Sequence, residues 1–321
     1  MIDTHRAAPI FIHGILQRSG TNFLWDLLLL RPDCAPARDP IREDLFLEHS
    51  DHLIAFVDAV RGAWDPIWGT FGGDLPERFY AAMGQGLVSF LRTDLDRRLV
   101  TKSPSVRHLE RFFAFFPSAR LLILVRDGRS VVQSAMNTFG WDFDRVCRVW
   151  AEAANTIRRF QRAEAARADR WRLVRYEDLL DDTEGQLRSI FEFLGLDATR
   201  YDFEAARSLP VRGSSWFGQQ NTRVHWEPVA KNASFAPKER WRAWSEDRLD
   251  RFEWLAGEQL RAFDYTAPPP RSSVTRSIKH ILRDWRWNAG SAVRWAVIQA
   301  RVRVGTASRP LRRRLGFLRD A

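Results

Sequence analysis

The stretch PIFIHGILQRSGTNFLWDLLLL, residues 9–30, constrains the fold more than any other part of the sequence. It begins with an apolar run that predicts a strand, and it continues as an apolar helix from Thr21 to about Leu30. Gly14 and Gly20 lie in the turn between them, where glycine permits backbone conformations that direct successive N–H groups at one anion. The positive end of the helix dipole favours the same ligand. This layout is typical of a phosphate-binding loop, although an ordinary strand–turn–helix corner has the same pattern.

The loop departs from the one that binds nucleoside triphosphates. That loop reads G-x-x-x-x-G-K-[ST], with a lysine for the phosphates and a hydroxyl for magnesium. Here the glycines are one residue further apart, and Thr21 stands in the place of the lysine. Arg18, Ser19 and Thr21 supply the side-chain donors instead. The sequence therefore indicates an anion whose recognition does not require that lysine.

Strands and helices alternate along the chain, which predicts an α/β fold: a three-layer sandwich whose central, mostly parallel sheet carries helices on both faces. The loops after residues 13, 103, 126 and 176 follow strand ends, and in such sheets ligands bind beyond the carboxyl ends of the strands. The predicted strands are 9–13, 98–103, 121–125 and 171–180, the last of which ends in a polar cluster. The predicted helices are 43–60, 77–95, 105–117, 142–168 and 183–195, and the predicted loops include 32–40 and 63–79.

Length and composition limit the class of protein. With 321 residues the chain can bury a full core. The two cysteines, Cys34 and Cys147, are too few for a disulfide framework or a cysteine zinc site. We see no signal peptide and no uninterrupted apolar run of about 18 residues, so we expect a cytoplasmic protein without a membrane span.

The net charge of +10 is concentrated at one end. Residues 267–321 hold 13 Lys or Arg and 2 Asp or Glu, whereas residues 1–266 hold 37 Lys or Arg and 38 Asp or Glu. We therefore expect a nearly neutral catalytic domain over 1–266 and a basic, amphipathic helical tail over 267–321. Such a tail could lie on an anionic membrane or pack against the body or a second subunit. Nothing in it resembles a nucleic-acid-binding module, so no nucleic-acid partner is predicted.

A second stretch, LVRDGRSVVQSAM, narrows the kind of anion that the chain is expected to bind. Arg126 ends a strand, and Ser134 lies eight residues on within the next helix, which Ser130 is well placed to cap. A guanidinium and a hydroxyl so placed can bind one phosphate together. The alternatives are a surface ion pair at Arg126, or a magnesium-binding Asp127 of a nucleotide hydrolase, against which the preceding arginine counts.

Taken in this order, QRSGTNFL and VRDGRSVVQS resemble the sulfotransferases that use 3′-phosphoadenosine-5′-phosphosulfate (PAPS). VTKSPSVRHLERFFAFFPSARLLILVRDGR and VRYEDLLDDTEGQLRSIFEFLGL also look like segments of that family, so the resemblance covers roughly residues 9–265. It implies a P-loop NTPase-like fold and metal-free transfer of a sulfuryl group from PAPS to an acceptor hydroxyl by in-line displacement. The acceptor could be a carbohydrate, a lipid, a tyrosine or a small molecule, and the sequence does not give the oligomeric state.

The resemblance also implies which residues bind the donor. Its RSGT-type loop binds the 5′-phosphosulfate, a strand-end arginine and a serine bind the 3′-phosphate, a tyrosine lies beside adenine, and a late basic loop closes over the 3′-phosphate. The matching residues here are Arg18, Ser19, Gly20, Thr21 and Asn22 for the loop, then Arg126 with Ser134, Tyr176, and Arg212, Gly213 and Ser214.

Catalysis in this family needs cations and a base. Arg18 and Lys102 match the cations, and Glu43 best matches the glutamate base of one branch of the family. His108 matches the histidine of another branch, although a packing or surface role suits its helix better. The competing residues near Glu43 are Asp44, Glu48, His49 and His52.

Two other functions stay open at this point. One is a P-loop nucleotide kinase or related phosphotransferase, which would need magnesium and ATP. The other is a non-catalytic nucleotide-binding protein recruited through its basic tail. Tryptophans and phenylalanines in predicted loops are candidates for an acceptor pocket, where flat rings can stack on a sugar or aromatic acceptor: Trp64, Trp68, Phe71, Trp141, Trp216 and Trp226.

Overall fold

The computed structural model describes residues 8–68, 74–211, 238, 240–266 and 273–289, with the backbone alone at 65–68 and 240. The chain divides into two compact units, Met1–Ala267 and Pro268–Ala321. In the second unit, residues 274–289 form a helix. Across the described ranges, we find no helix with the length and hydropathy needed to cross a membrane.

The first unit contains a five-stranded sheet in the order β2-β3-β1-β4-β5. Its pairings are all parallel, with Ile12 of β1 opposite Lys102 of β3 and His13 opposite Ile123 of β4. The predicted α/β class is confirmed, and the described sheet is parallel throughout. The strands are β1 (Ile10–Gly14), β2 (Cys34–Pro36), β3 (Arg98–Ser103), β4 (Arg120–Val125) and β5 (Trp171–Arg175).

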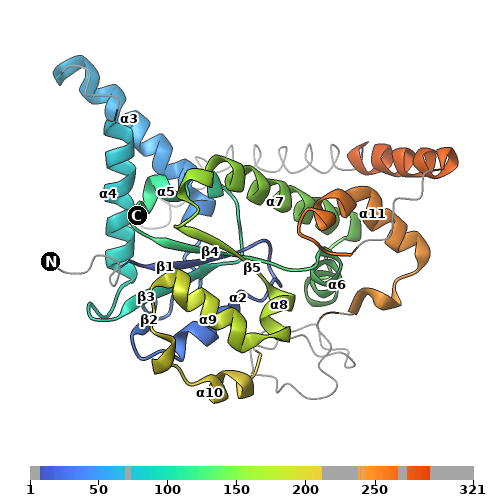
Figure 1. Cartoon of the computed structure of the whole chain (residues 1–321). Helices are drawn as coiled ribbons and strands as arrows, with labels where there is room; N and C mark the ends of the chain where they lie inside the picture. Colours follow the sequence, from blue (N-terminus) through green and yellow to red (C-terminus); the bar gives the residue numbers. More distant parts are fainter. Residues whose placement is uncertain (1–7, 69–73, 212–237, 239, 267–272, 290–321) are drawn as a thin grey trace, which may run out of the picture. The chain divides into compact units, whose positions relative to one another are not determined.

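Helices cover both faces of the sheet (Figure 1). They are α2 (Thr21–Leu29), α3 (Ser50–Trp68), α4 (Leu75–Leu91), α5 (Phe112–Phe115), α6 (Gly128–Phe139), α7 (Phe143–Ala163), α8 (Tyr176–Asp181), α9 (Thr183–Leu194), α10 (Phe203–Ser208) and α11 (Glu246–Arg261). Short 3-10 turns are η1 (Leu47–His49), η2 (Leu109–Arg111), η3 (Ala165–Arg167), η4 (Ala198–Arg200) and η5 (Arg240–Ala243).

Two apolar cores lie on opposite faces of the sheet because side chains alternate along each strand. Phe11 and Ile123 belong to the core that includes α7 and α11. Ile12 and Leu122 belong to the core that includes α2 and α9. Both strands are buried on both faces, as their uninterrupted apolar sequences predict.

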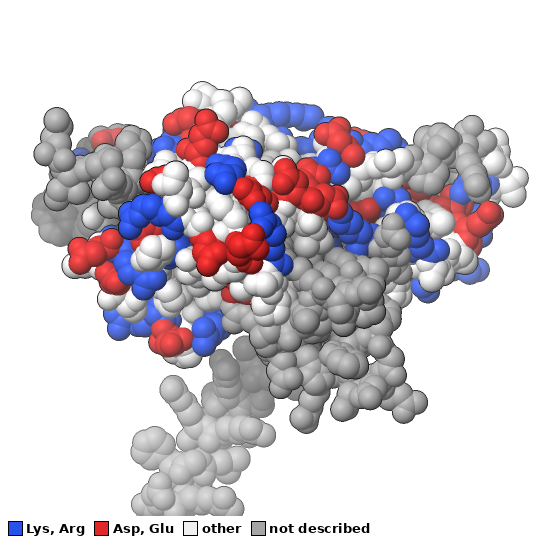
Figure 2. Space-filling model, turned by 60° about the horizontal axis from the view of Figure 1, so that its bottom comes forward, with Lys and Arg blue, Asp and Glu red and all other residues white. Residues whose placement is uncertain are grey.

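The described surface is mixed in charge. Figure 2 shows Lys and Arg interspersed with Asp and Glu on the described part of one face. This agrees with the near balance of charges over residues 1–266. The basic excess of the sequence therefore belongs to the tail.

Two segments predicted as loops are partly regular. Residues 34–36 form β2 at the sheet edge, where Pro36 costs no central ladder hydrogen bond. Helix α3 continues to Trp68 although a loop was predicted from residue 63. Trp64 stacks on Phe79 of α4, with 6.1 Å between ring centroids and 6° between ring planes, and this packing supports the extra turns.

The strand predicted from residue 171 ends at Arg175, because α8 begins at Tyr176. Two helical predictions were also wrong in detail. Residues 43–46 are not helical, and a helix begins only after the η1 turn. The segment 105–117 is not one helix, because His108 has a left-handed φ of 58° and only η2 and α5 follow it. The cap of α6 is the Asp127 carboxylate, which accepts from the Arg129 N–H at 2.8 Å. Ser130 lies inside the helix and donates its hydroxyl to the Lys238 carbonyl.

Candidate functional site

The candidate site lies at the carboxyl edge of the sheet, between β1 and β4. The chain leaves β1 towards the β2 edge and leaves β4 towards β5, so the connections diverge at this point. A crevice at such a divergence is the usual ligand site of an open parallel sheet. The loops after β1, β3, β4 and β5 supply the residues described below.

The glycine turn after β1 is tightly closed. Gly20 has φ 98° and Arg18 has φ 76°, both in the left-handed region. A Cβ at Gly20 would overlap the ring of Tyr176, and one at Gly14 would overlap the side chains of Ser19 and Thr21. Glycine is therefore required at both positions, for conformation at Gly20 and for space at both.

The turn contains a hydroxyl without a partner. Ser19 is 1% exposed, and its Oγ makes no hydrogen bond within the described residues. Thr21 and Asn22 begin α2, whose first N–H groups lie at the same turn. A buried donor and a helix N-terminus at one turn suit an anionic group.

The two predicted phosphate-binding stretches meet. Arg18 Nε donates to Ser134 Oγ at 3.0 Å, and Arg126 Nη1 donates to the Arg18 carbonyl at 2.6 Å. The Arg126 guanidinium carbon lies 4.6 Å from the centre of the Tyr176 ring, within cation–π distance. Four of the predicted donor-binding residues are thus in one connected group.

Glu177, the residue after Tyr176, connects the end of β5 to the end of β4 through hydrogen bonds. Its Oε1 accepts from the Asp127 N–H at 3.1 Å, and its Oε2 accepts from the Tyr265 hydroxyl at 2.7 Å. These bonds fix the start of α8, and with it the position of Tyr176 beside Arg126. No local sequence pattern marks Glu177, because its partners come from distant elements.

Glu43 and Lys102 form an ion pair. Lys102 Nζ lies 3.3 Å from Glu43 Oε1, and the side chains are 4% and 32% exposed respectively. Lys102 Nζ also lies 6.0 Å from the centre of the Trp25 ring of α2. A buried ammonium and a half-exposed carboxylate therefore meet at the end of β3.

A buried cluster of Asp44, Thr101 and His13 holds Glu43 in place, and of these three only Asp44 was named from the sequence, as a competing base. Asp44 Oδ2 accepts from the Thr101 hydroxyl at 2.8 Å, and the Asp44 N–H donates to the Lys102 carbonyl at 3.0 Å. Burial raises the pKa of Asp44, and the nearby His13 opposes that rise. His13 is 1% exposed, and burial lowers its pKa against the attraction of Asp44. A buried acid and a buried imidazole thus anchor the chain next to Glu43.

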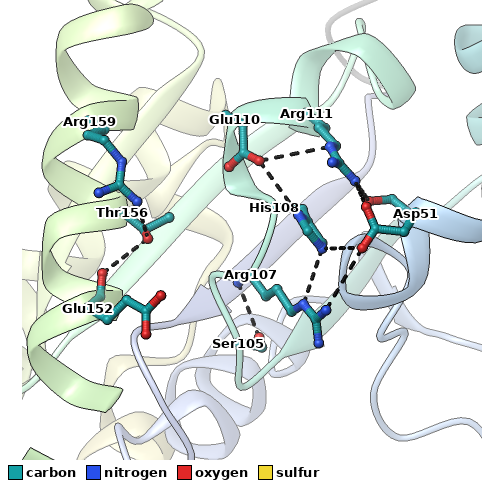
Figure 3. A network of polar contacts seen from close by, with 10 residues as sticks. Asp51, Ser105, Arg107, His108, Glu110, Arg111, Glu152, Thr156 and Arg159 are labelled. Carbon is teal, nitrogen blue, oxygen red and sulfur yellow. Dashed lines mark hydrogen bonds and ion pairs between the residues drawn. The ribbon is translucent and has the colours of Figure 1, made fainter. Parts of the chain in front are cut away.

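A cavity of about 730 Å³ lies between α7 and the segments that follow β1 and β3. It is bounded by residues 15–17 after β1, residues 104–108 after β3, and one side of α7. Trp141 and Glu48 complete its lining. Figure 3 shows polar side chains from α7 facing the segment after β3.

His108 belongs to a surface network and not to the Glu43–Lys102 pair. Its Nε2 lies 3.1 Å from Asp51 Oδ2, and Arg107 Nε lies 3.1 Å from the same nitrogen (Figure 3). The same Asp51 accepts from Arg111 at 2.6 Å. His108 therefore lines the cavity as part of an ion-pair network.

The remaining predicted residues divide into two groups. Glu48 lines the cavity, whereas His49 and His52 are exposed at the start of α3. Of the aromatic candidates, Trp141 lines the cavity and Trp64 packs on α4. The predictions outside the described residues, or at side chains that are not described, are Arg212, Gly213, Ser214, Trp68, Phe71, Trp216 and Trp226.

Comparison with known proteins gives the family. The family model described as Sulfotransferase family matches residues 9–200. A search of curated protein sequences found no match. The match spans more than half of the chain, and it includes both predicted phosphate-binding stretches and the Glu43–Lys102 pair.

Three solved sulfotransferase structures are similar to this chain at low sequence identity. The sulfotransferase domain of the olefin synthase from Synechococcus PCC 7002 aligns with TM-score 0.49 and 20% identity over 82% of this chain and 97% of that one. A sulfotransferase from Mycobacterium avium, STF9, aligns with TM-score 0.46 and 16% identity over 81% of this chain and 78% of that one. A mouse sulfotransferase complexed with PAP (3′,5′-diphosphoadenosine) aligns with TM-score 0.40 and 11% identity over 81% of this chain and 86% of that one.

The fold and the glycine-turn site thus define a P-loop-like α/β protein. The chain belongs to the sulfotransferase family, and the predicted resemblance is confirmed.

Proposed function

We propose that this protein transfers a sulfuryl group from PAPS to an acceptor hydroxyl. The observation that carries the proposal is the contact between Arg18 and Ser134, with Arg126 bonded to the same loop. It supports one ligand that reaches both the glycine turn and Ser134 within α6. A doubly phosphorylated adenosine has anionic groups at both ends and therefore suits this arrangement.

The residues of the site fit that donor. Ser19 has a buried hydroxyl without a partner among the described residues, and Arg18 of the same turn contacts Ser134. We assign the 5′-phosphosulfate to residues 18–22 and the 3′-phosphate to Arg126 and Ser134. We assign the adenine to the side of Tyr176, because aromatic rings stack on bases.

Bound PAPS would supply the sulfuryl group. We assign Glu43 the acceptor's proton: as the acceptor oxygen bonds to sulfur and the bond from sulfur to the 5′-phosphate oxygen breaks, the hydroxyl proton passes to a Glu43 carboxylate oxygen. Lys102 and Arg18 supply positive charge for the departing phosphate. The ion pair with Lys102 and the anchored Asp44 keep Glu43 at the end of β3.

We assign the acceptor to the 730 Å³ cavity. Residues 15–17 and 104–108 bound it, and these segments directly continue the ones that hold Arg18 and Lys102. Gln17 of the lining directly precedes Arg18, and Pro104 follows Lys102 after one residue, whereas the two cations themselves do not line the cavity. Its volume lies within the range that is usual for small-molecule sites.

The direct test is transfer from PAPS labelled with sulfur-35, measured with and without EDTA. We expect labelled product to form at the same rate in both. An enzyme that instead requires Mg²⁺ and uses ATP labelled at the γ-phosphate would contradict the proposal and favour a phosphotransferase. Tight PAP binding without turnover of PAPS, even by slow hydrolysis, would favour a non-catalytic nucleotide-binding protein.

A further inference from the structure

The lining of the acceptor cavity indicates which class of acceptor it takes. Charged side chains of both signs line it in equal number: three arginines (Arg107, Arg145, Arg159) and three glutamates (Glu48, Glu110, Glu152). Burial of an apolar acceptor such as a sterol would strip water from these charges without replacing their hydrogen bonds, which is costly. The lining therefore disfavours a large apolar acceptor.

Equal numbers of charges also argue against an ionic acceptor. An anion would meet the glutamates, and a cation would meet the arginines. A hydroxyl group serves both, because it donates to a carboxylate and accepts from a guanidinium. An acceptor with several hydroxyls can therefore use both kinds of side chain at once.

Three of these charges are available for such bonds. Within the described residues, the side chains of Glu48, Arg145 and Glu152 make no ion pair or hydrogen bond. Arg145 and Glu152 share one side of α7 with Thr156, whose hydroxyl bonds back to the Glu152 carbonyl at 3.1 Å (Figure 3). The hydrogen-bonding groups of Glu48, Arg145 and Glu152 are therefore available to a ligand in the cavity.

An aromatic ring completes the arrangement. Trp141 lines the cavity and packs on Phe139 with 4.7 Å between ring centroids. Indole rings bind the apolar C–H face of a sugar ring, while its hydroxyls bond to polar neighbours. A sugar has both features, whereas a sterol or a phenol has only one of them.

We propose that the acceptor is a neutral carbohydrate, bound by the mixed-charge wall of α7 and by Trp141. This inference rests on the proposed sulfuryl transfer. It is tested with the full chain, PAPS and three acceptor panels: neutral disaccharides, tyrosine-containing peptides and hydroxysterols. We expect turnover with disaccharides. PAP binding, measured separately by calorimetry, tests the donor site alone, so failure of the acceptor class is distinguishable from failure of the proposed function.

Two variants test the wall itself. Glu152→Gln and Arg145→Gln should each raise KM for the disaccharide about tenfold while kcat and PAP affinity stay the same. Glu192→Gln, an exposed glutamate on α9, should change none of these values. The inference is overturned if sterols or peptides are the preferred acceptors, if no neutral saccharide is turned over although PAP binds, or if both α7 variants keep the KM of the parent.

A second inference comes from the helix at residues 274–289 and is independent of the active site. Its large apolar residues are exposed: Val274 78%, Ile278 52%, Ile281 56%, Leu282 55% and Trp285 70%. They recur at i, i+4, i+7, i+8 and i+11, which places them on one face of the helix. We call these five residues the apolar stripe.

Basic residues accompany the apolar stripe. The helix carries Arg276, Lys279, Arg283 and Arg286 against the single acid Asp284. An exposed apolar face with a tryptophan, bordered by basic residues, has the chemistry of a helix that lies in the interface of an anionic bilayer. We infer that this helix binds an anionic lipid surface through the apolar stripe.

The test is sedimentation of the full chain with vesicles of phosphatidylcholine alone or with phosphatidylserine. We expect binding to the anionic vesicles, reduced about tenfold in the variant Ile281→Ser/Trp285→Ser. The variant Lys279→Glu/Arg286→Glu, which keeps the stripe, should also reduce it. The matched control is Phe90→Ser/Leu95→Ser, because those residues are 56% and 85% exposed in the first unit. The inference is overturned if the parent binds neutral and anionic vesicles equally, or if Ile281→Ser/Trp285→Ser binds anionic vesicles as well as the parent does. It is also overturned if the parent is a dimer that this variant dissociates.

Discussion

Arg18 and Ser134 are hydrogen-bonded at 3.0 Å although 116 residues separate them in the chain. The bond joins the glycine turn after β1 to the helix after β4, and Arg126 bonds the same turn through the Arg18 carbonyl. Residues predicted for the two ends of the donor therefore already touch. A donor that binds here must exchange this bond for bonds to its own anionic groups.

Removing the Ser134 hydroxyl tests its role at the 3′-phosphate. We expect Ser134→Ala to weaken PAP binding about tenfold, because a hydrogen bond to a charged group contributes about 1.5–3 kcal/mol. Binding of adenosine 5′-phosphosulfate, which lacks the 3′-phosphate, should change little. Calorimetry with both nucleotides measures the difference. The matched control is Ser189→Ala, whose hydroxyl accepts from Arg172 at 2.7 Å on α9 and should leave both affinities unchanged. Equal losses for both nucleotides would contradict the assignment.

Glu43→Gln tests the base. The amide cannot take up the acceptor's proton, so we expect kcat to fall by about a hundredfold or more, while PAP affinity stays within about twofold. Steady-state kinetics and calorimetry give the two values. Glu77→Gln, an exposed glutamate on α4, is the control and should have the parent's kcat. Parent-like turnover in Glu43→Gln would mean that another group accepts the proton.

Two glycine substitutions should act in opposite directions. Gly20→Ala puts a Cβ into the Tyr176 ring at a φ of 98°, so we expect a loss of about 1–3 kcal/mol in the free energy of unfolding. Gly86→Ala lies in α4 with no atom near the new Cβ, and it should stabilise by about 0.5–1 kcal/mol. Denaturant unfolding measures both. A Gly20→Ala protein as stable as the parent would contradict the close approach of Tyr176.

The buried imidazole makes stability depend on pH. Burial lowers the pKa of His13 in the folded chain below its ordinary value of 6.5. Below pH 6.5 the unfolded chain therefore binds a proton that the folded chain does not, and the free energy of unfolding falls as the pH falls. The contribution of one such group is at most about 1.4 kcal/mol per pH unit.

The variant His13→Asn isolates this contribution. An asparagine keeps a donor for the Ser105 carbonyl, which His13 Nδ1 contacts at 2.8 Å, but it does not titrate. Denaturant unfolding between pH 5 and 7 should show a flatter pH dependence than the parent. His49→Asn, at an exposed position, should keep the parent's slope. Identical slopes in the parent and His13→Asn would show that His13 does not contribute in this window.

The sequence predicted the parts of the site that are local. Gly20 marks the turn through its spacing from β1, and Arg126 follows an apolar run that predicts a buried strand. Ser134 follows from its distance along α6. These sequence patterns depend only on neighbouring residues in the chain, so they can be recognised without knowledge of the fold.

The parts that depend on distant contacts were out of reach. Asp44 bonds to Thr101 across 57 residues, and Glu177 joins Asp127 to Tyr265. Neither acid has a local pattern that sets it apart from a surface carboxylate. The extension of α3 past residue 63 has the same origin, because the stacking of Trp64 on Phe79 depends on how α3 and α4 pack.

The most direct test of the account is calorimetric titration of the full chain with PAP in the presence of EDTA, for the parent and for Arg126→Ala. The account predicts binding of one PAP per chain without metal, weakened at least about tenfold in Arg126→Ala. Absence of PAP binding, or equal affinity in the two proteins, would contradict it.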